Sequence, residues 1–220
     1  MIKCRGMKAG TFKLIILLAA CMLLAQEVRA QGTLYLSNLG QGAFGVGTGN
    51  GGWLAQGIET GTDSGGYVLN SVDLGMTTAT GTPGGIEVAI YSALNGVPYQ
   101  NLGTLNGSVN PSSAGVYEYD SSGIMLAPST EYFVVAMDAT TVSGGYYNWL
   151  ANAEGASVTS LNDWSIQGNY GSGNSGSTWA GIRAYGLQTA IYATPVPEPS
   201  LWILGAIGTG ILVCVRMRRA

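Results

Sequence analysis

The chain of 220 residues has no histidine, and its central part, residues 31–195, has neither lysine nor cysteine. Histidine is the commonest general base and the commonest metal ligand, so both roles would fall to other side chains. A Ser-His-Asp or Cys-His arrangement cannot form in the central part, and lysine Schiff-base chemistry is excluded there. Charged residues are also scarce, at 10% of the chain, against about a quarter in ordinary globular proteins.

The few charges are unevenly placed along the chain. Eight of the nine basic residues lie in the first 30 or the last five positions, and Arg183 alone lies between them. Residues 31–195 carry ten carboxylates, so their formal charge is ten negative minus one positive, or -9. A segment this acidic does not neutralise phosphates, and we therefore expect no nucleic-acid partner. The ten carboxylates are Glu59, Asp63, Asp73, Glu87, Glu118, Asp120, Glu131, Asp138, Glu154 and Asp163.

The first 30 residues are typical of a cleaved secretory signal peptide. A basic region ends near Lys13, and residues 14–25 form an apolar run that is too short for a comfortable membrane span. Val28 and Ala30 supply the modest side chains that a signal peptidase reads, so the mature chain is expected to begin at Gln31. This pattern implies an export translocon and a signal peptidase as partners. An uncleaved anchor is the alternative.

The three cysteines lie only in the terminal segments. Residues 18–21, Leu-Ala-Ala-Cys, match a lipoprotein box in which Cys21 would be acylated, but the apolar stretch continues past the cysteine. We therefore interpret Cys21 as an apolar residue of the signal peptide, with lipidation as the alternative. Because Cys4 and Cys214 also lie at the ends, the body has no disulfide scaffold.

The last 20 residues combine an apolar span with a basic end. Residues 201–215 contain no charge, and as a helix they would extend roughly 22 Å across a hydrocarbon core of roughly 30 Å. Local thinning or snorkelling of the arginines covers the difference. Arg216, Arg218 and Arg219 are expected to stay cytoplasmic, which places the body outside.

Just before this span stand Pro197, Glu198 and Pro199. Pro-Glu-Pro, a short apolar span and a terminal arginine cluster together resemble the tripartite PEP-CTERM sorting signal, over residues 196–220. The resemblance implies that an exosortase, a membrane-embedded cysteine protease, processes the chain near the motif, in bacteria with an outer membrane and an exopolysaccharide locus. The chain would be a substrate of that system and not an enzyme. A plain tail anchor with a proline hinge is the alternative, since hydropathy does not separate the two.

Residues 31–195 have the pattern of an all-β body. Thirty of the 35 glycines fall there, and Asn95-Gly96 and Asn106-Gly107 are typical hairpin turns. Alternating runs predict roughly nine strands, and the continuous run 131–138 predicts a central strand buried on both sides. Many short strands without helices favour a single β-sandwich or jelly roll, with a mobile loop at 169–177. The strand-like runs are 33–37, 53–59, 67–74, 86–91, 115–120, 131–138, 146–150 and 185–193.

The body also resembles the choice-of-anchor domains, with the type-R variety nearest. The resemblance rests on residues 31–40, 53–61, 88–98 and 126–135, which describe strands and turns. It implies an extracellular β-sandwich module that occurs with various surface-anchoring tails, and it implies no particular chemistry.

Carboxylates are the main candidates for catalysis or metal binding in such a body. Glu118 and Asp120 share one strand face, as a carboxylate-dependent glycosidase would need, although an exposed polar face is the simpler interpretation. A structural calcium ion would suit the acidic loops, but Asp63 and Asp138 are only single carboxylates near loop edges. No other cofactor is predicted.

Tryptophans are the candidates for sugar binding. Trp53 and Trp149 lie in strand-like runs and are expected in the core. Trp164 and Trp179 flank the glycine-rich loop and are the better candidates for stacking on a glycan, although burial is the usual fate of tryptophan.

Taken together, the sequence predicts a signal peptide (1–30), an extracytoplasmic β body (31–195) and a sorting signal (196–220). We expect an exported surface or matrix protein that is held transiently at the inner membrane and then associates with exopolysaccharide. Its role would be structural or adhesive. A carbohydrate-binding module is the alternative.

Overall fold

The computed structural model describes residues 32–48, 52–138, 144–153, 156–182 and 185–197, and these residues form strands and loops without any helix. The all-β class is therefore confirmed. The described residues form sixteen strands in two antiparallel sheets, where the sequence predicted roughly nine.

The first sheet has ten strands. They are β1 (Thr33–Ser37), β2 (Ala43–Thr48), β4 (Tyr67–Gly81), β7 (Asn106–Gly107), β8 (Gly115–Asp120), β9 (Met125–Leu126), β11 (Gly145–Asn152), β12 (Thr159–Ser160), β15 (Tyr185–Leu187) and β16 (Thr189–Pro195). The second sheet has six strands in the order β14-β13-β3-β10-β5-β6. They are β3 (Trp53–Glu59), β5 (Ile86–Leu94), β6 (Val97–Thr104), β10 (Glu131–Asp138), β13 (Ser165–Ser172) and β14 (Ala180–Gly181).

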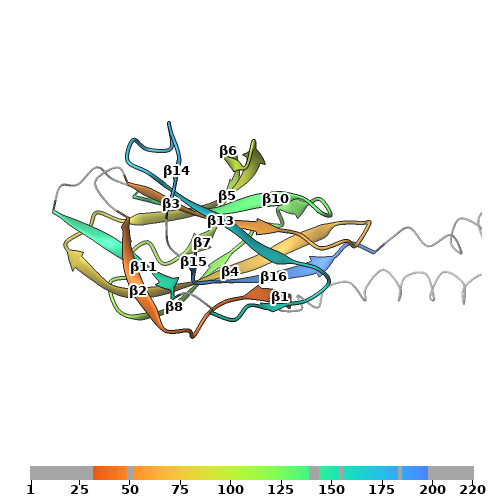
Figure 1. Ribbon diagram of the computed structural model, residues 1–220, viewed down its shortest axis with the longest axis horizontal. Helices are drawn as coiled ribbons and strands as arrows, with labels where there is room; N and C mark the ends of the chain where they lie inside the picture. Colours follow the sequence, from red (N-terminus) through yellow and green to blue (C-terminus); the bar gives the residue numbers. More distant parts are fainter. Residues whose placement is uncertain (1–31, 49–51, 139–143, 154–155, 183–184, 198–220) are drawn as a thin grey trace, which may run out of the picture. The chain divides into compact units, whose positions relative to one another are not determined.

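One long or fully buried strand organises each sheet (Figure 1). In the first sheet, the 15-residue β4 pairs with β16 and β11 and also with β8 and β9. In the second sheet, β10 lies between β3 and β5, and its residues 132–137 are all buried. The prediction of a central strand buried on both sides is confirmed, because each parity of β10 packs against a different apolar layer.

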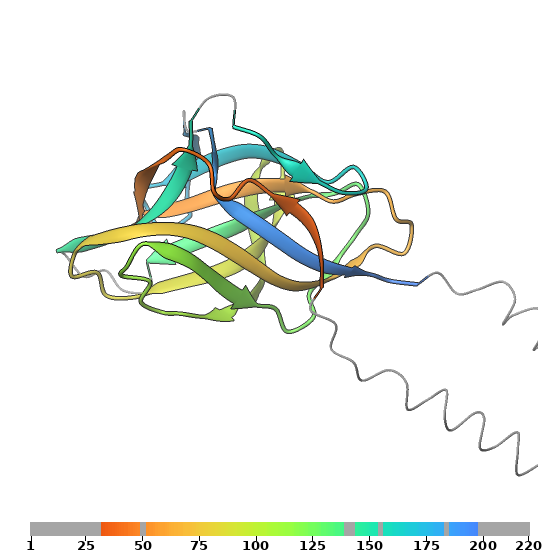
Figure 2. The same cartoon turned by 90° about the horizontal axis from the view of Figure 1, so that it is seen from below.

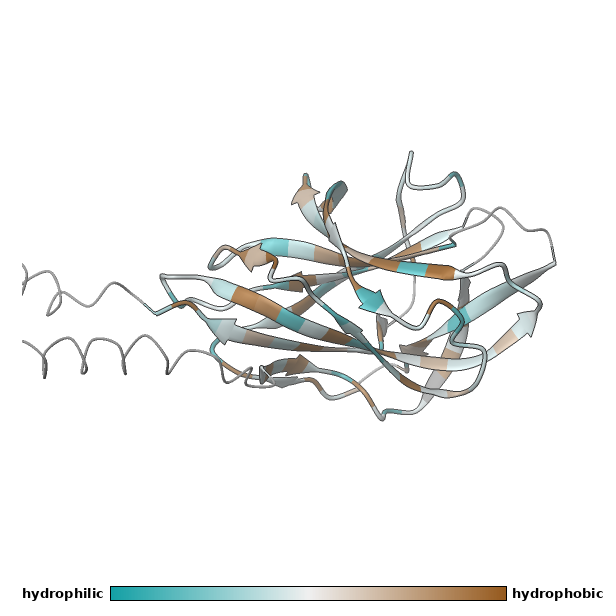
Figure 3. Ribbon diagram, turned by 180° about the vertical axis from the view of Figure 1, so that it is seen from behind, coloured by the Kyte–Doolittle hydropathy of each residue, from teal (hydrophilic) through white to brown (hydrophobic). Residues whose placement is uncertain are grey.

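The main core lies between the two sheets and draws side chains from both. Trp149 of β11 is fully buried in it, as predicted, and its indole N–H donates to the Gln188 carbonyl at 2.8 Å. Ile58 and Val134 fill the same core from the second sheet. Apolar stretches appear in the strands of both layers (Figure 3). This shared core gives the body its sandwich-like character.

A buried glutamine bridges the two sheets inside this core. The side chain of Gln56, on β3, is fully buried and accepts a hydrogen bond from the Leu187 N–H of β15. Its amide nitrogen donates to the carbonyls of Gly57 and Gln167, each at 2.9 Å. Buried polar groups are tolerated when all are hydrogen-bonded, so Gln56 holds β3, β13 and β15 in one arrangement.

The turn predictions had mixed outcomes. Asn95 and Gly96 have φ angles of 54° and 73°, so the predicted hairpin turn between β5 and β6 is confirmed. Asn106-Gly107 was wrongly predicted as a turn, because these residues form β7 and pair with β8. The predicted mobile loop 169–177 was also partly wrong, since residues 169–172 belong to β13 and pair with β3.

The two ends of the described body lie on neighbouring strands. Thr33 of β1 pairs with Ala193 of β16, and Figure 2 shows both strands reaching the same end of the body. The Val196 N–H donates to the Gly66 carbonyl at 2.9 Å, and the next residue, Pro197, is exposed. The first and last strands of the described body therefore meet at the same end.

Several predicted features fall outside the described residues. They are the signal-peptide positions Val28 and Ala30, Cys21, the motif residues Glu198 and Pro199, the span 201–215, and Arg216, Arg218 and Arg219. Within the described ranges, the search for an apolar helix of membrane-crossing length finds none.

Candidate functional site

Trp164, one of the two predicted sugar-stacking residues, is buried. It is only 1% exposed, and its ring packs against Tyr35 at 5.3 Å and Tyr67 at 4.9 Å. The chain reverses just before it, with a Trp164 N–H to Leu161 carbonyl hydrogen bond of 3.2 Å. Trp164 therefore has the burial that is usual for tryptophan and is not available for glycan stacking, because this tight turn directs the indole into the main core.

Trp179, the second predicted residue, lies on the outer side of the second sheet. It is half-buried and stands next to Trp53, with ring centres 6.3 Å apart and planes inclined by 55°. Trp53 is also half-buried on this side, so its predicted place in the main core is wrong. Tyr91 on β5 is a second neighbour of Trp53, with ring centres 6.5 Å apart and planes inclined by 69°.

These rings cover a second, smaller core. Trp53, Tyr91, Tyr170 and Trp179 form what we call the outer aromatic face, and each is half-buried. Beneath them lie side chains that are at most 5% exposed: Ala55, Ala89, Phe133, Val135 and Met137. The outer side of a two-layer antiparallel fold is usually polar, so this face is more apolar than the architecture requires.

Individual contacts hold the covering rings in place. Tyr170 packs edge-on against Phe133 with ring centres 5.6 Å apart, and the Tyr91 hydroxyl points at the Met137 sulfur at 3.5 Å. Sequence reasoning missed Tyr91. Strand alternation could have identified it, because Tyr91 lies two residues after Ala89 and both therefore point to the face opposite Ile90.

The loop between β13 and β14 supports Trp53. Ser172 Oγ accepts the Gly176 N–H at 2.9 Å, and Asn174 Oδ1 accepts the Thr178 N–H at 2.9 Å. Gly176 has a φ of +80°, and a Cβ built on it would lie 2.5 Å from the Trp53 ring. The loop backbone therefore packs directly on Trp53 at a position that only glycine accommodates easily, and it leads into Trp179.

Polar groups flank the outer aromatic face. Glu59 and Glu131 lie opposite each other at one end of β3 and β10, and Gln167 Nε2 donates to Glu59 Oε2 at 2.8 Å. Burial, and then the Glu59 charge, raise the pKa of Glu131 above its usual value. On β5, Glu87 Oε1 accepts from the Thr104 hydroxyl at 2.8 Å. The face thus offers hydrogen-bonding groups beside its rings.

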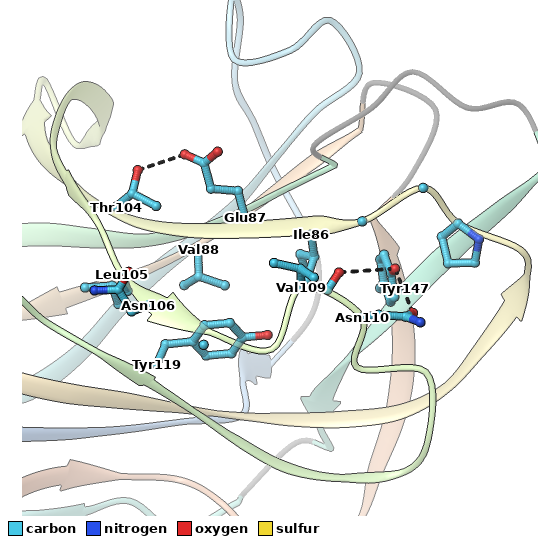
Figure 4. A pocket seen from close by; sticks show the side chains of 14 residues that line it. Ile86, Glu87, Val88, Thr104, Leu105, Asn106, Val109, Asn110, Tyr119 and Tyr147 are labelled. Carbon is cyan, nitrogen blue, oxygen red and sulfur yellow. Dashed lines mark hydrogen bonds between the residues drawn. The ribbon is translucent and has the colours of Figure 1, made fainter.

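A separate pocket of about 470 Å³ lies where the chain crosses from β6 to β7 (Figure 4). Ile86, Val88 and Leu105 contribute its apolar wall. Tyr119 and Tyr147 also line it, but their hydroxyls donate to the Ser108 carbonyl at 3.1 Å and to Asn110 Oδ1 at 3.0 Å, respectively. Glu87 is the only carboxylate among the lining residues, so the pocket lacks the carboxylate pair of a glycosidase.

The predicted carboxylate pair lies elsewhere. Glu118 and Asp120 are exposed on the outer side of the first sheet, where Glu118 faces Asp73 and Asp120 faces Ser71. Burial, and then the Glu118 charge, raise the pKa of Asp73 to about 6, while a hydrogen bond from Tyr192 opposes the shift. None of these carboxylates lines the pocket.

The predicted calcium ligands are also separated. Asp63 accepts a 3.4 Å hydrogen bond from Asn162 in the loops beyond the Glu59 end of β3, whereas Asp138 lies at the other end of the sheet. Among the described residues, no three Asp, Glu, Cys or His side chains gather in a way that could hold a metal ion.

The chain matches no protein-family model, no curated protein and no solved structure. The resemblances to PEP-CTERM and choice-of-anchor proteins therefore rest on the sequence motifs alone. The outer aromatic face is the described region whose composition the fold does not explain, and it is the candidate functional site.

Proposed function

We propose that this protein is an exported bacterial surface or extracellular-matrix protein with a structural or adhesive role in or near exopolysaccharide. Signal peptidase would remove residues 1–30, the inner membrane would hold the chain through residues 201–215, and an exosortase would process the tail. One observation carries the proposal: Pro197-Glu198-Pro199, an apolar span and Arg216, Arg218 and Arg219 follow one another at the end of the sequence.

The described body supports this proposal in two ways. It is all-β with one main core between two sheets, as expected of a single β-sandwich or jelly-roll module of the choice-of-anchor kind. After β16, Val196 still makes a backbone hydrogen bond to Gly66 of the body, and the next residue, Pro197, is exposed. A protease needs its substrate extended, and two prolines disfavour a helix there.

The test replaces Pro197-Glu198-Pro199 by three alanines in a host that has an exosortase. We expect a longer, membrane-held product, detected by immunoblotting of membrane and extracellular fractions. Pro195→Ala, at the end of β16 and outside the motif, is the matched control and should be processed normally. Identical processing and release of the triple variant would contradict the proposal.

Carbohydrate binding is the second candidate function, and the outer aromatic face favours it. Half-exposed tryptophan and tyrosine rings beside carboxylates and amides suit the apolar faces and hydroxyl edges of sugars. A glycosidase finds no comparable support, because Glu118 and Asp120 lie on an open strand face. Loss of a glycan-cleaving activity in Glu118→Gln would be needed to revive it.

A further inference from the structure

The outer aromatic face is apolar beyond what folding needs. On β3 and β10 the apolar positions that point away from the main core are Trp53, Ala55, Phe133, Val135 and Met137. Polar residues at these positions would leave the main core intact, because the alternate residues of the same strands, which point inward, fill it. Four half-buried aromatic rings instead form its outermost layer.

We infer that the outer aromatic face binds a single neutral glycan chain of twisted, non-planar shape. The inference deepens the proposed role in exopolysaccharide and rests on that role for its biological setting. The binding residues would be Trp179, Trp53 and Tyr91, which contact the apolar ring faces of consecutive sugars. The flanking polar groups would receive the sugar hydroxyls.

Charge selects against other ligands. Residues 31–195 carry ten carboxylates and a single basic residue, Arg183, so their formal charge is -9. Glu59, Glu131 and Glu87 stand on the same sheet as the rings. Nucleic acids, anionic lipid surfaces and acidic polysaccharides would meet an excess of like charge on a body with this net charge. A neutral sugar chain avoids this repulsion and still accepts and donates hydrogen bonds.

Ring geometry selects the shape of the glycan. In the sheet order β14-β13-β3-β10-β5, Trp53 on β3 lies between Trp179, just before β14, and Tyr91 on β5, with ring centres 6.3 and 6.5 Å away, so the three rings form one row across the face. The planes are inclined by 55° and 69° to Trp53. Flat, crystalline polysaccharide surfaces require nearly coplanar rings, whereas a chain that rotates from one sugar to the next presents its faces in different directions.

Hydrogen-bonding groups lie on both sides of the rings. Gln167 already donates to Glu59 with one N–H, which orients that carboxylate at one end of the face. Thr104 does the same for Glu87 on β5. An ionised carboxylate accepts several hydrogen bonds, so each retains acceptor capacity for sugar hydroxyls after its internal contact is made.

The test measures binding of the full-length protein, in phosphatidylcholine nanodiscs, to defined glycans by calorimetry and affinity electrophoresis. The neutral, non-planar probes are laminarin, amylose and dextran. Alginate is the anionic probe, and microcrystalline cellulose is the flat one. We expect binding to at least one neutral soluble glycan and none to alginate or cellulose.

Two substitutions make the test specific to the face. Trp179→Ala should weaken binding at least about tenfold, as expected for the loss of one well-stacked ring, and Trp179→Phe should restore part of it. Tyr146→Ala removes an aromatic side chain that is 41% exposed on the first sheet, and it is the matched control with unchanged binding. Thermal unfolding of each variant verifies the fold.

Several outcomes would overturn the inference. They are failure to bind any of the three neutral glycans, preference for alginate or cellulose, and undiminished binding by Trp179→Ala in a folded protein. A Trp179-dependent dimer without glycan binding would show that a second copy covers the face. Tail processing is measured separately on the same variants, so failure of glycan binding and failure of sorting are distinguishable.

Discussion

The outer sides of the two sheets have opposite characters. On the first sheet, β8 exposes Val116, Glu118 and Asp120, and Asp73 and Ser71 of β4 lie opposite. On the second sheet, aromatic rings cover a buried apolar layer. Both sheets use their inner sides for the same main core. The fold therefore leaves the outer sides free to vary, and the apolar outer side reflects something other than the needs of this core.

On β10, the central strand of the second sheet, the side chains that point toward the main core and those that point outward are both buried. Phe133 and Val135 are as fully buried beneath the outer aromatic face as Val134 is in the main core. The outer aromatic face thus contributes to stability as well as offering a binding surface. Substitutions at matched places on the two outer sides can separate these contributions.

The largest expected effect comes from Phe133→Ala, which empties the layer below the rings. We expect the free energy of unfolding to fall by about 3 kcal/mol, because the ring is fully buried and its loss leaves a cavity. Val116→Ala, on the outer side of the first sheet and 59% exposed, should change it by less than about 0.5 kcal/mol. Urea unfolding measured by fluorescence would test both values, and equal effects would erase the contrast between the two outer sides.

A smaller effect is expected from Gly176→Ala. Its φ of +80° disfavours alanine, and the added Cβ would press on the Trp53 ring. We expect a loss of about 2 kcal/mol and a changed tryptophan emission spectrum. Gly173→Ala is the control in the same loop, because a Cβ there meets nothing within 4 Å. If both variants behave alike, the loop does not hold Trp53.

The smallest expected effect on stability concerns Asp73, on the carboxylate-bearing outer side of the first sheet, and it depends on pH. Folded Asp73, with a pKa of about 6, holds its proton more tightly than the unfolded residue, whose pKa is about 4. Stability should therefore fall as the pH rises from 4 to 6 and remain lower above pH 6. Asp73→Asn should reduce this slope, while Glu131, whose pKa is also raised, keeps its own share, and the substitution should add about 1 kcal/mol at pH 7.5, after allowance for solvent screening.

The matched control for this pH dependence is Asp120→Asn, on the same outer side of the first sheet. It should leave the slope between pH 4 and 6 in place, since Asp120 is exposed and faces Ser71 and not a carboxylate. Chemical unfolding at several pH values measures both variants. A wild-type protein that gains stability between pH 4 and 6 would contradict the assignment to Asp73.

Much of the strand content was predictable from local pattern. The runs 33–37, 53–59, 115–120 and 131–138 coincide with β1, β3, β8 and β10. Strands β2, β6 and β13 were missed because their glycine, asparagine and proline residues locally favour turns. They form strands because their backbone groups hydrogen-bond to neighbouring strands, and this pairing depends on the tertiary structure.

The candidate site was only partly predictable. Trp164 and Trp179 were both named from their place beside a glycine-rich loop, with burial as the favoured interpretation of each, and Trp53 was expected in the core; the structure separates Trp164 in the main core from Trp53 and Trp179 on the outer side. Sequence alternation indicates that two sets of side chains point in opposite directions. It does not say which set meets the other sheet, because that depends on how the sheets pack.

The amino-acid sequence alone determined the all-β class, the absence of histidine chemistry, the acidic charge of the body and the pattern of the two terminal segments. These properties follow from composition and short-range periodicity, which need no long-range contact. Tertiary structure decided which tryptophans are buried, brought Trp53, Trp179 and Tyr91 together from two strands and a loop, and set Asp73 against Glu118. Such contacts join residues far apart in the chain, and only the packing and register of the strands bring them within reach of one another.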